Sequence, residues 1–352
     1  MRRVAIVVVI AIAALAAFAV AQPPADKNNV SVSVLGLFHP QEVEISPANG
    51  ELLECKDGAG ADLFFVDGAL DLRRQSTKIL LRSADVTKSA DSVFCDNGQG
   101  APTNLLVTIA GKISRRYRGE LEIRADAREL LVLVRMNLET AVASVVAAES
   151  PPGAPQEMLK AQAVAARSFF VAGKGRHHNF DFCDTTHCQF LRQPPQSGSP
   201  AASAAAATQG MVLAYKDSPF AAMYSASCGG HTHSLQDLGI AVKDYPYYAV
   251  TCDYCLRHPE KWVAQLSEAD ASRLHATESS RLQLARKLGW QTVQSNSYSW
   301  QREQGSVLIA GVGKGHGIGL CQRGAADMAR HGASFQEILA HYYPNTTVKE
   351  LR

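Results

Sequence analysis

Hydrophobic and polar positions alternate along the first third of the chain in the manner of half-buried strands. Val30, Val32 and Val34 are separated by Ser31 and Ser33, and this period of two is typical of a strand with one buried face. Short apolar runs bounded by turn-forming residues continue the pattern at 79–81, 105–109, 117–123 and 130–134. The last two predict a hairpin. His, Cys and carboxylate residues do not gather here, so we interpret residues 31–114 as a β-rich scaffold or binding region.

A helical period replaces this alternation at Met136. Leu138, Val142 and Val145 repeat at helical spacing until Pro151 and Pro152 end the pattern, because proline cannot continue a helix. A second helix is predicted from about Pro155, which suits a first turn, to Phe170.

The rest of the chain mixes element types. We expect a His/Cys-rich loop at 177–189, a flexible Pro/Ser/Gly/Ala linker at 194–207, strands within 211–232, a surface helix at 264–288, a strand at 307–312, and helices at 322–332 and 334–343. Strands interleaved with a few helices, without regular βα alternation, predict an α+β fold in which the helices line a cleft.

The chain opens with an export signal. Arg2 and Arg3 precede an apolar run over 4–20, and Ala19-Val20-Ala21 matches a small-residue cleavage site, so residues 1–21 are predicted to be a signal peptide and 22–30 a linker. An uncleaved membrane anchor is the alternative, because the run is at the lower edge of a membrane-spanning length. Both interpretations place the remainder outside the cytoplasmic membrane.

Composition and charge exclude some classes of function. The chain has 352 residues, of which 46% are hydrophobic and 19% charged, which excludes global disorder. The formal net charge is +2, and without Arg2 and Arg3 the basic and acidic residues are equal in number. A balanced chain has no long-range field to attract nucleic acid or anionic lipid, so neither is expected as a partner.

Eight cysteines lie in the exported part of the chain. Cys55 and Cys95 are isolated from the others, and export makes a disulfide between them the simple prediction. The Cys-x-x-Cys motif at 252–255 lacks a thioredoxin-like context, so we expect it to pair structurally with Cys228 or Cys321.

Glu149 occupies an unusual position for a carboxylate. It continues the apolar stripe of Val142, Val145 and Val146 at positions i, i+3, i+4 and i+7, so it is either partly buried or at the edge of a cleft. Desolvation and the negative end of the helix dipole both disfavour its charged form. A raised pKa is what a general acid needs near neutral pH. The alternative is a glutamate that emerges into solvent at a helix end.

A group of metal-ligand residue types follows the second helix. Twelve residues beginning at His177 offer two thiols and three imidazoles, and the set His177, Cys183, His187 and Cys188 suits tetrahedral zinc. A closed four-ligand shell leaves no position for water, so this zinc would be structural. The alternatives are a Cys183–Cys188 disulfide, a solvated turn, and His178 in place of His177 as a ligand.

Other motifs carry little chemistry. No Walker motif occurs, and the glycine-rich segment 313–319 does not follow the spacing of a dinucleotide-binding loop. Ser225 or Ser227 with His231 or His316 would be a hydrolase pair, but no G-x-S-x-G nucleophile elbow supports it.

Several blocks of sequence together resemble the SpoIID/LytB domain family. The blocks occur in the family's order at 136–149, 159–168, 182–189, 224–232, 315–325 and 335–344. The resemblance covers about residues 115–348, which we therefore interpret as a SpoIID-like catalytic domain. The chain departs from the family pattern at Ala141, Ser150 and Cys321.

The resemblance implies a protein that acts on peptidoglycan. Sporulation members of the family are lytic transglycosylases that cut glycan strands lacking stem peptides, and other members are described as amidase enhancers. The family's catalytic glutamate falls on Glu149, and its zinc ligands fall on His177, Cys183, His187 and Cys188. The expected reaction is cleavage between N-acetylmuramic acid (MurNAc) and N-acetylglucosamine (GlcNAc), with 1,6-anhydro-MurNAc ends as product.

The matching motifs also imply cleft residues that bind sugar hydroxyls and acetamides. These are Arg167, Gln189, Tyr224, His316 and Gln322. The alternatives are a non-catalytic wall-binding enhancer of an N-acetylmuramoyl-L-alanine amidase and a zinc amidase, which would need an open coordination position. The expected partners are glycan strands and a cell-wall amidase, and the expected location is periplasmic, cell-wall associated or extracellular.

Overall fold

The computed structural model describes residues 28–351, apart from 49, 100–101, 242–243 and 276. The predicted signal peptide and residues 22–27 of the linker lie outside the described residues. Among the helices that are described, none combines the length and the apolar character that crossing a membrane requires. Strands and helices are interleaved without βα regularity, so the predicted α+β class is confirmed.

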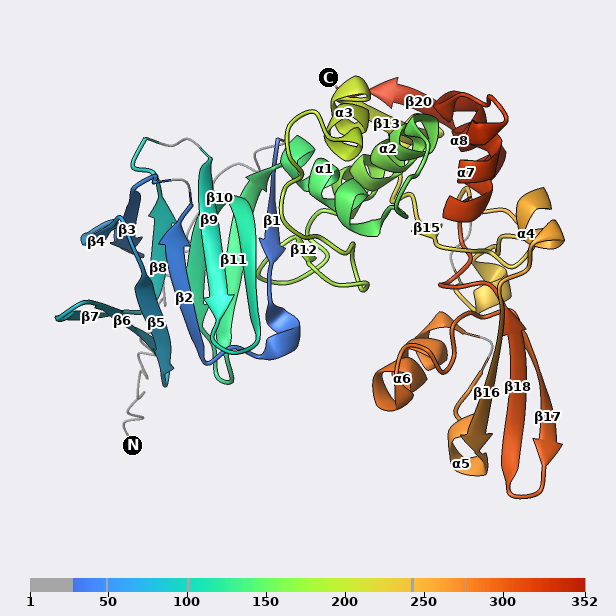
Figure 1. The fold of residues 1–352 in the computed structure, drawn as a ribbon, viewed down its shortest axis with the longest axis horizontal. Coiled ribbons are helices and arrows are strands. Elements are labelled where there is room, and N and C mark those ends of the chain that lie inside the picture. The colour runs from blue at the N-terminus through green and yellow to red at the C-terminus, as the bar shows by residue number, and fades with distance from the viewer. Residues whose placement is uncertain (1–27, 49, 100–101, 242–243, 276, 352) are drawn as a thin grey trace, which may run out of the picture.

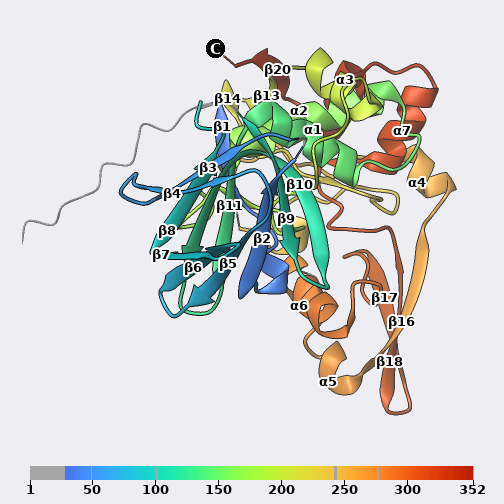
Figure 2. The same cartoon turned by 60° about the vertical axis from the view of Figure 1, so that its left-hand side comes forward.

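The first eleven strands, together with the later strand β12, form one twelve-stranded sheet that folds into two layers. The first layer runs in the order β12 (Phe182–Cys183), β1 (Asn29–Ser33), β11 (Leu130–Asn137), the end of β10 (Ile113–Ala125), β8 (Ser92–Asp96), β3 (Leu53–Asp57) and β4 (Asp62–Val66). The second runs from the start of β10 through β9 (Thr103–Ile109), β2 (Glu42–Pro47), β5 (Leu70–Gln75) and β6 (Lys78–Ser83) to β7 (Val86–Ala90). Figure 2 shows both layers and the shared strand.

Strand β10 passes from one layer to the other at Gly119. Its residues up to Gly119 pair with β9, and those from Glu120 onward pair with β11 and β8. A Cβ at Gly119 would lie 2.3 Å from the carbonyl oxygen of Arg135, so a side chain there would collide with the neighbouring strand. The predicted hairpin of 117–123 with 130–134 is confirmed. The predicted boundary between residues 114 and 115 falls inside β10, so one strand belongs to both predicted regions.

The core between the layers follows the predicted alternation. Val30 and Val32 are buried, as are the inward residues of the later strands, among them Ile45, Leu72 and Val107. Cys55 and Cys95 lie directly opposite one another on β3 and β8 and form the predicted disulfide.

Three helices pack beside this sheet, as Figure 1 shows in green and yellow-green. They are α1 (Leu138–Glu149), α2 (Gln156–Gly173) and α3 (Pro200–Ala207). Helix α1 follows β11 directly, and the Asn137 side chain caps it by accepting a hydrogen bond from the Glu139 N–H. Val142, Val145 and Val146 are buried, so the predicted apolar stripe is confirmed.

The prediction of a flexible linker at 194–207 is wrong, because Pro200–Ala207 form helix α3. The Ser199 hydroxyl caps the helix by accepting from the Ala202 N–H at 3.3 Å, and Pro200 occupies its first turn. Ala201, Ala204 and Ala205 are buried, because their small side chains let the helix lie close to α1 and α2. The alanine run is therefore a packed helix instead of a spacer.

The C-terminal part completes this helical layer. Strands β13 (Met211–Tyr215), β14 (Ser218–Pro219) and β20 (Thr347–Glu350) form a small sheet, and β15 (Tyr224–Ser225) pairs in parallel with β19 (Leu320–Cys321). The predicted final helices are confirmed as α7 (Gln322–Arg330) and α8 (Phe335–Tyr342). Short 3-10 turns occur at η1 (Gly36–Phe38) and η2 (Gln236–Leu238).

Residues 261–312 form a separate lobe, here called the insert module. It follows α4 (Asp253–Arg257) and contains β16 (Lys261–Ser267), α5 (Glu268–Ala271), α6 (Glu278–Leu288), β17 (Tyr298–Glu303) and β18 (Ser306–Val312). Its three strands enclose a small core of their own around Trp262 and Ile309. Figure 1 shows it in orange, projecting away from the helices.

The predicted surface helix at 264–288 is wrong over its first part. Trp262 and Leu266 are buried and Ala264 is half-buried on one face of β16, which is the period of a strand and not of a helix. Only the second part of the segment, α6, is a helix of more than one turn.

Candidate active site

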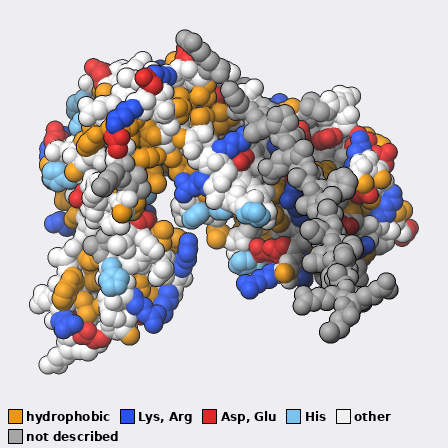
Figure 3. All heavy atoms as spheres, turned by 180° about the vertical axis from the view of Figure 1, so that it is seen from behind, with side chains coloured by type: hydrophobic (Ala, Val, Ile, Leu, Met, Phe, Trp, Pro, Cys, Tyr) orange, Lys and Arg blue, Asp and Glu red, His pale blue; other side chains and the backbone are white. Residues whose placement is uncertain are grey.

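A cavity of about 430 Å³ lies between the helical layer and the insert module, a size typical of small-ligand sites. Its wall comes from the end of α1, the His/Cys loop, β15, α6 with the loop after it, the turn at 314–316, and the start of α7. From behind, the molecule is visibly hollowed between the insert module and the rest, as Figure 3 shows.

Glu149 lines this cavity at the last residue of α1. Its side chain is half-buried, and its carboxyl accepts a hydrogen bond from the Phe190 N–H. Burial raises the pKa of Glu149 to about 7, although hydrogen bonds with Tyr224 and the Phe190 amide lower it. A carboxyl with this pKa is partly protonated at neutral pH. The glutamate therefore does not emerge into solvent, which was the alternative.

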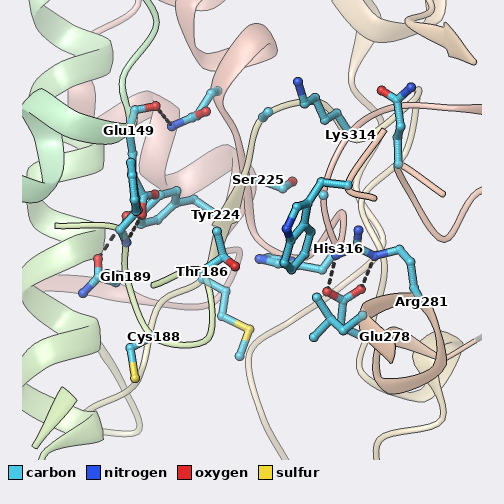
Figure 4. A pocket seen from close by; sticks show the side chains of 18 of the residues that line it. Glu149, Thr186, Cys188, Gln189, Tyr224, Ser225, Glu278, Arg281, Lys314 and His316 are labelled. Atoms are coloured by element: carbon cyan, nitrogen blue, oxygen red, sulfur yellow. Dashed lines mark hydrogen bonds and ion pairs between the residues drawn. The ribbon is translucent and has the colours of Figure 1, made fainter. Parts of the chain in front are cut away.

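Tyr224 connects Glu149 to the helical layer. Its hydroxyl donates to Gln189 Oε1 at 3.0 Å, and Gln189 Nε2 donates to the Ala166 carbonyl at 3.2 Å. Because the Gln189 amide is oriented by both contacts, its oxygen faces the tyrosine. Figure 4 shows Glu149, Tyr224 and Gln189 together on one side of the cavity.

His316 also lines the cavity, beside the backbone of Tyr224 (Figure 4). Its Nδ1 accepts from the Ile318 N–H at 3.0 Å, which places the proton of the neutral ring on Nε2. Burial lowers the pKa of His316, and a hydrogen bond to the Tyr224 backbone opposes this shift. Both ring nitrogens are therefore engaged, and the histidine supports the wall next to Tyr224.

The His/Cys loop brings its four predicted ligands together. The ligand atoms of His177, Cys183, His187 and Cys188 all lie within 4.8 Å of one another. His177 Nε2 is 3.3 Å and His187 Nδ1 3.6 Å from Cys188 Sγ. Tetrahedral zinc with bonds of about 2.0–2.3 Å places its ligand atoms roughly 3.3–3.8 Å apart, so the donors and their spacing fit this ion.

The same loop forms part of the cavity wall. Cys183 and Cys188 are free thiols, and hydrogen bonding with Cys188 lowers the pKa of Cys183 to about 4. Thr186, Cys188, Gln189 and Phe190 line the cavity. Interactions that hold the His/Cys loop in place therefore also position the Phe190 amide that contacts Glu149.

Comparisons with known proteins agree on one family. The family described as Stage II sporulation protein matches residues 126–215. An uncharacterized protein of Brachyspira hyodysenteriae is 30% identical over 262 residues, which are 64% of this chain and 70% of the relative. Stage II sporulation protein D of Bacillus amyloliquefaciens is 29% identical over 259 residues, covering 60% of this chain and 74% of the relative.

A more distant relative carries a different name. The Amidase enhancer of Bacillus subtilis is 24% identical over 283 residues, covering 58% of this chain and 39% of the relative. The chain belongs to the SpoIID/LytB family. Membership of the SpoIID/LytB family supports a role related to the cell wall.

One predicted cleft residue of this SpoIID/LytB protein lies elsewhere. Arg167 is fully buried and does not line the cavity. It donates to both carboxylate oxygens of Glu139 at 2.8 and 2.6 Å and to the Met211 carbonyl at 3.0 Å. Its predicted role in substrate binding is wrong, because its donors are used to join α2 to α1 and β13. Gln189, Tyr224, His316 and Gln322 do line the cavity.

Sequence reasoning missed the wall that the insert module contributes. Glu278 and Arg281 of α6 form a salt bridge at 2.8 and 2.5 Å in the cavity wall, and Asn296 Nδ2 donates to Glu278 at 2.7 Å. Burial alone would raise the pKa of Glu278, but the Arg281 pair and other partners lower it overall. Trp290 also lines the cavity. The i, i+3 spacing of Glu278 and Arg281 predicts a helix-surface pair but not its position opposite Glu149.

Proposed function

We propose that this chain is a peptidoglycan lytic transglycosylase that cleaves the MurNAc–GlcNAc backbone, with peptide-free strands as substrate. The observation that carries the proposal is Glu149, a carboxyl whose pKa burial raises to about 7 in a cavity of about 430 Å³. Family membership and the amidase-enhancer relative support action on the cell wall.

The reaction needs one carboxyl that changes roles. Protonated Glu149 donates its proton to the glycosidic oxygen as the bond from that oxygen to the anomeric carbon of MurNAc breaks. The resulting carboxylate then takes the proton of the muramic acid 6-hydroxyl, and that oxygen bonds to the anomeric carbon. The products are a free GlcNAc 4-hydroxyl and a 1,6-anhydro-MurNAc end, and no water is consumed.

The state of Glu278 favours this route over hydrolysis. An ordinary glycosidase needs a second carboxyl as nucleophile or base. Glu278 is the other carboxylate among the described residues that line the cavity, but Arg281 and Asn296 engage its oxygens. A carboxylate held in this way is a poor nucleophile.

Tyr224 can serve both protonation states of Glu149. A hydroxyl has one proton and can also accept. When the proton points to Glu149, it stabilises the carboxylate. When it points to Gln189 Oε1, 3.0 Å away, the hydroxyl oxygen can accept from the neutral acid. We propose that the Tyr224 hydroxyl reorients during the reaction, so that it donates to the Glu149 carboxylate and accepts from the neutral acid.

The cavity wall on the module side is suited to hold the sugar. Trp290 is 48% exposed and offers an aromatic surface on which the apolar face of a pyranose can pack. Lys314 is an exposed cation in the same wall. Gln189 and Gln322 are largely engaged with protein groups, so we assign them to positioning Glu149 and Tyr224.

We also propose that His177, Cys183, His187 and Cys188 hold a structural zinc ion. When bound, zinc would supply a closed four-ligand cross-link with no exchangeable water. The chain's own contribution is then to keep Gln189 and Phe190 in place beside Glu149. This closed set argues against a zinc amidase.

A second candidate is a non-catalytic enhancer of a cell-wall amidase, favoured by the name of the Bacillus subtilis relative. Digestion of purified peptide-free glycan strands, with products weighed by mass spectrometry, separates the candidates. Anhydro-MurNAc ends support the lyase, and reducing ends would mean hydrolysis. If no product forms but a purified amidase is stimulated on whole peptidoglycan, the chain is an enhancer.

A further inference from the structure

Four cysteines from distant parts of the sequence meet outside the active site. Cys228, Cys252, Cys255 and Cys321 are buried free thiols, and their four sulfur atoms lie within 4.8 Å of one another. The sequence predicted pairing of the 252–255 motif with one partner, whereas the structure gathers all four residues. We propose that they form a second metal site, a tetrathiolate that binds one zinc ion.

The spacing of the sulfur atoms fits a single ion. Cys255 Sγ and Cys321 Sγ are 3.6 Å apart, whereas a disulfide bond is about 2.05 Å long. Four thiolates around tetrahedral zinc, with Zn–S bonds of about 2.3 Å, lie roughly 3.8 Å apart. An iron–sulfur cluster would need its cysteines further apart, because several iron and sulfide atoms would lie between them.

Hydrogen-bond donors surround the sulfur atoms, as expected around metal-bound thiolates. The Cys228 N–H donates to Cys321 Sγ at 3.4 Å, and the Tyr342 hydroxyl is 3.4 Å from Cys252 Sγ. The Ser227 hydroxyl is 3.6 Å from Cys255 Sγ. These contacts would stabilise the negative charge that remains when four thiolates bind one divalent cation.

Gly324 of α7 leaves the space that the side chains of Cys252 and Tyr342 occupy. A Cβ at this position would lie 2.5 Å from Cys252 Sγ and 2.0 Å from the Tyr342 hydroxyl oxygen. Both distances are shorter than a nonbonded contact, so a glycine is required where α7 passes the cluster. The cysteine and the tyrosine that contacts it therefore approach the helix backbone directly.

The position of the cluster indicates what it would stabilise. Cys228, Cys252 and Cys255 precede the insert module in the chain, and Cys321 follows it. A metal here would close the base of the module, which Figure 1 shows below α4. Cys228 also comes four residues after Tyr224, and Cys321 directly precedes Gln322, so the same bonds would hold two walls of the cavity. The site would thus keep α6 opposite Glu149.

Two disulfides are the competing arrangement, because export exposes the chain to oxidation. The test uses the full chain, exported into an oxidising compartment in zinc-supplemented medium and purified without reductant. We expect two zinc ions per chain by elemental analysis and native mass spectrometry. Cys252→Ser should bind one, Cys183→Ser should also bind one, and the double variant none.

A measurement on the unaltered chain keeps the test independent of whether Cys252→Ser folds. Alkylation under denaturing conditions with a chelator, but without reductant, should label six thiols and leave the Cys55–Cys95 disulfide. Cobalt substitution in Cys183→Ser should produce the intense sulfur-to-metal absorption of a tetrathiolate. One zinc per chain, with only two alkylated thiols and a mass that shows three disulfides, would overturn the proposal. None of these readouts depends on glycan cleavage.

Discussion

The main-chain N–H of Phe190 donates a hydrogen bond to the carboxyl of Glu149. Phe190 comes two residues after Cys188, so the His/Cys loop delivers this donor to the end of α1. The contact favours the carboxylate and partly offsets the effect of burial on the pKa. The position of Glu149 therefore depends on the His/Cys loop. A substitution that disturbs this loop should reduce the activity that requires Glu149.

Replacement of His177 tests this connection. We expect His177→Ala to lose one zinc ion per chain and to lower kcat by about 10- to 100-fold, the usual cost of disturbing the shell around a functional group. Elemental analysis and glycan cleavage rates measure the two effects. His178→Ala is the matched control, because His178 is exposed and lies outside the ligand group. Equal zinc loss in both variants would contradict the ligand assignment.

The burial of Glu149 predicts a pH-dependent effect on stability. The folded pKa of about 7 exceeds the ordinary glutamate pKa of 4.5, so the folded state binds more protons than the unfolded state between these values. The resulting decrease in the free energy of unfolding is absent at low pH, grows as pH rises through this window, and persists above it. Glu149→Gln should remove it and raise the free energy of unfolding at pH 8 by about 1–3 kcal/mol.

Urea denaturation at pH 4 and pH 8 measures this difference. At pH 4 the gain from Glu149→Gln should be much smaller, since both states of the wild-type carboxyl are then largely protonated. Glu303→Gln, at an exposed position of β17, is the control and should show no such dependence. An equal effect at both pH values would mean that the carboxyl is not desolvated.

Tyr224→Phe should move the pH profile of cleavage. The hydrogen bond with Tyr224 lowers the pKa of Glu149, so its removal should raise that pKa further. Activity that requires the protonated acid would then persist to higher pH, although kcat at the optimum should fall. The descending limb of kcat/KM against pH measures the shift. Tyr298→Phe, within the insert module, is the control; an unmoved limb in Tyr224→Phe would contradict the proposed coupling.

Arg167→Met should reduce stability and leave substrate binding largely unaffected. Its buried guanidinium joins α2 to α1 through Glu139, and to α3 and β13 through two main-chain carbonyls. Breaking a buried ion pair costs about 3–5 kcal/mol. Urea denaturation and KM for glycan strands measure the two properties. The control is Arg116→Met on the exposed face of β10. A stable variant with a strongly raised KM would return Arg167 to the substrate site.

Local pattern was sufficient to predict much of the fold. The alternation around Val30 and the repeat of Val142, Val145 and Val146 predicted a buried strand and a buried helix face, because each depends only on neighbouring residues. The same repeat drew attention to Glu149. The disulfide between Cys55 and Cys95 was predictable because those cysteines lie far from the others in sequence.

Features that depend on tertiary packing were not predictable in this way. The alanines of α3 have the composition of a linker, and only their burial against α1 and α2 makes them a helix. Arg167 lies in a family motif, but its role is decided by Glu139 on another helix. Glu278 and Arg281 reach the cavity because α6 lies on the side of the insert module that faces the rest of the molecule, which local periodicity does not specify.

The central claim is that Glu149 supplies the proton for glycan cleavage, and the most direct test is the rate at which 1,6-anhydro-MurNAc ends form. Wild type, Glu149→Gln and the control Glu303→Gln would be compared at pH 6 on peptide-free strands, after each variant is shown to be folded. We expect wild type and the control to form these ends at equal rates, and Glu149→Gln to be slower by about 10²- to 10⁴-fold. Undiminished formation of anhydro ends by Glu149→Gln would contradict the account.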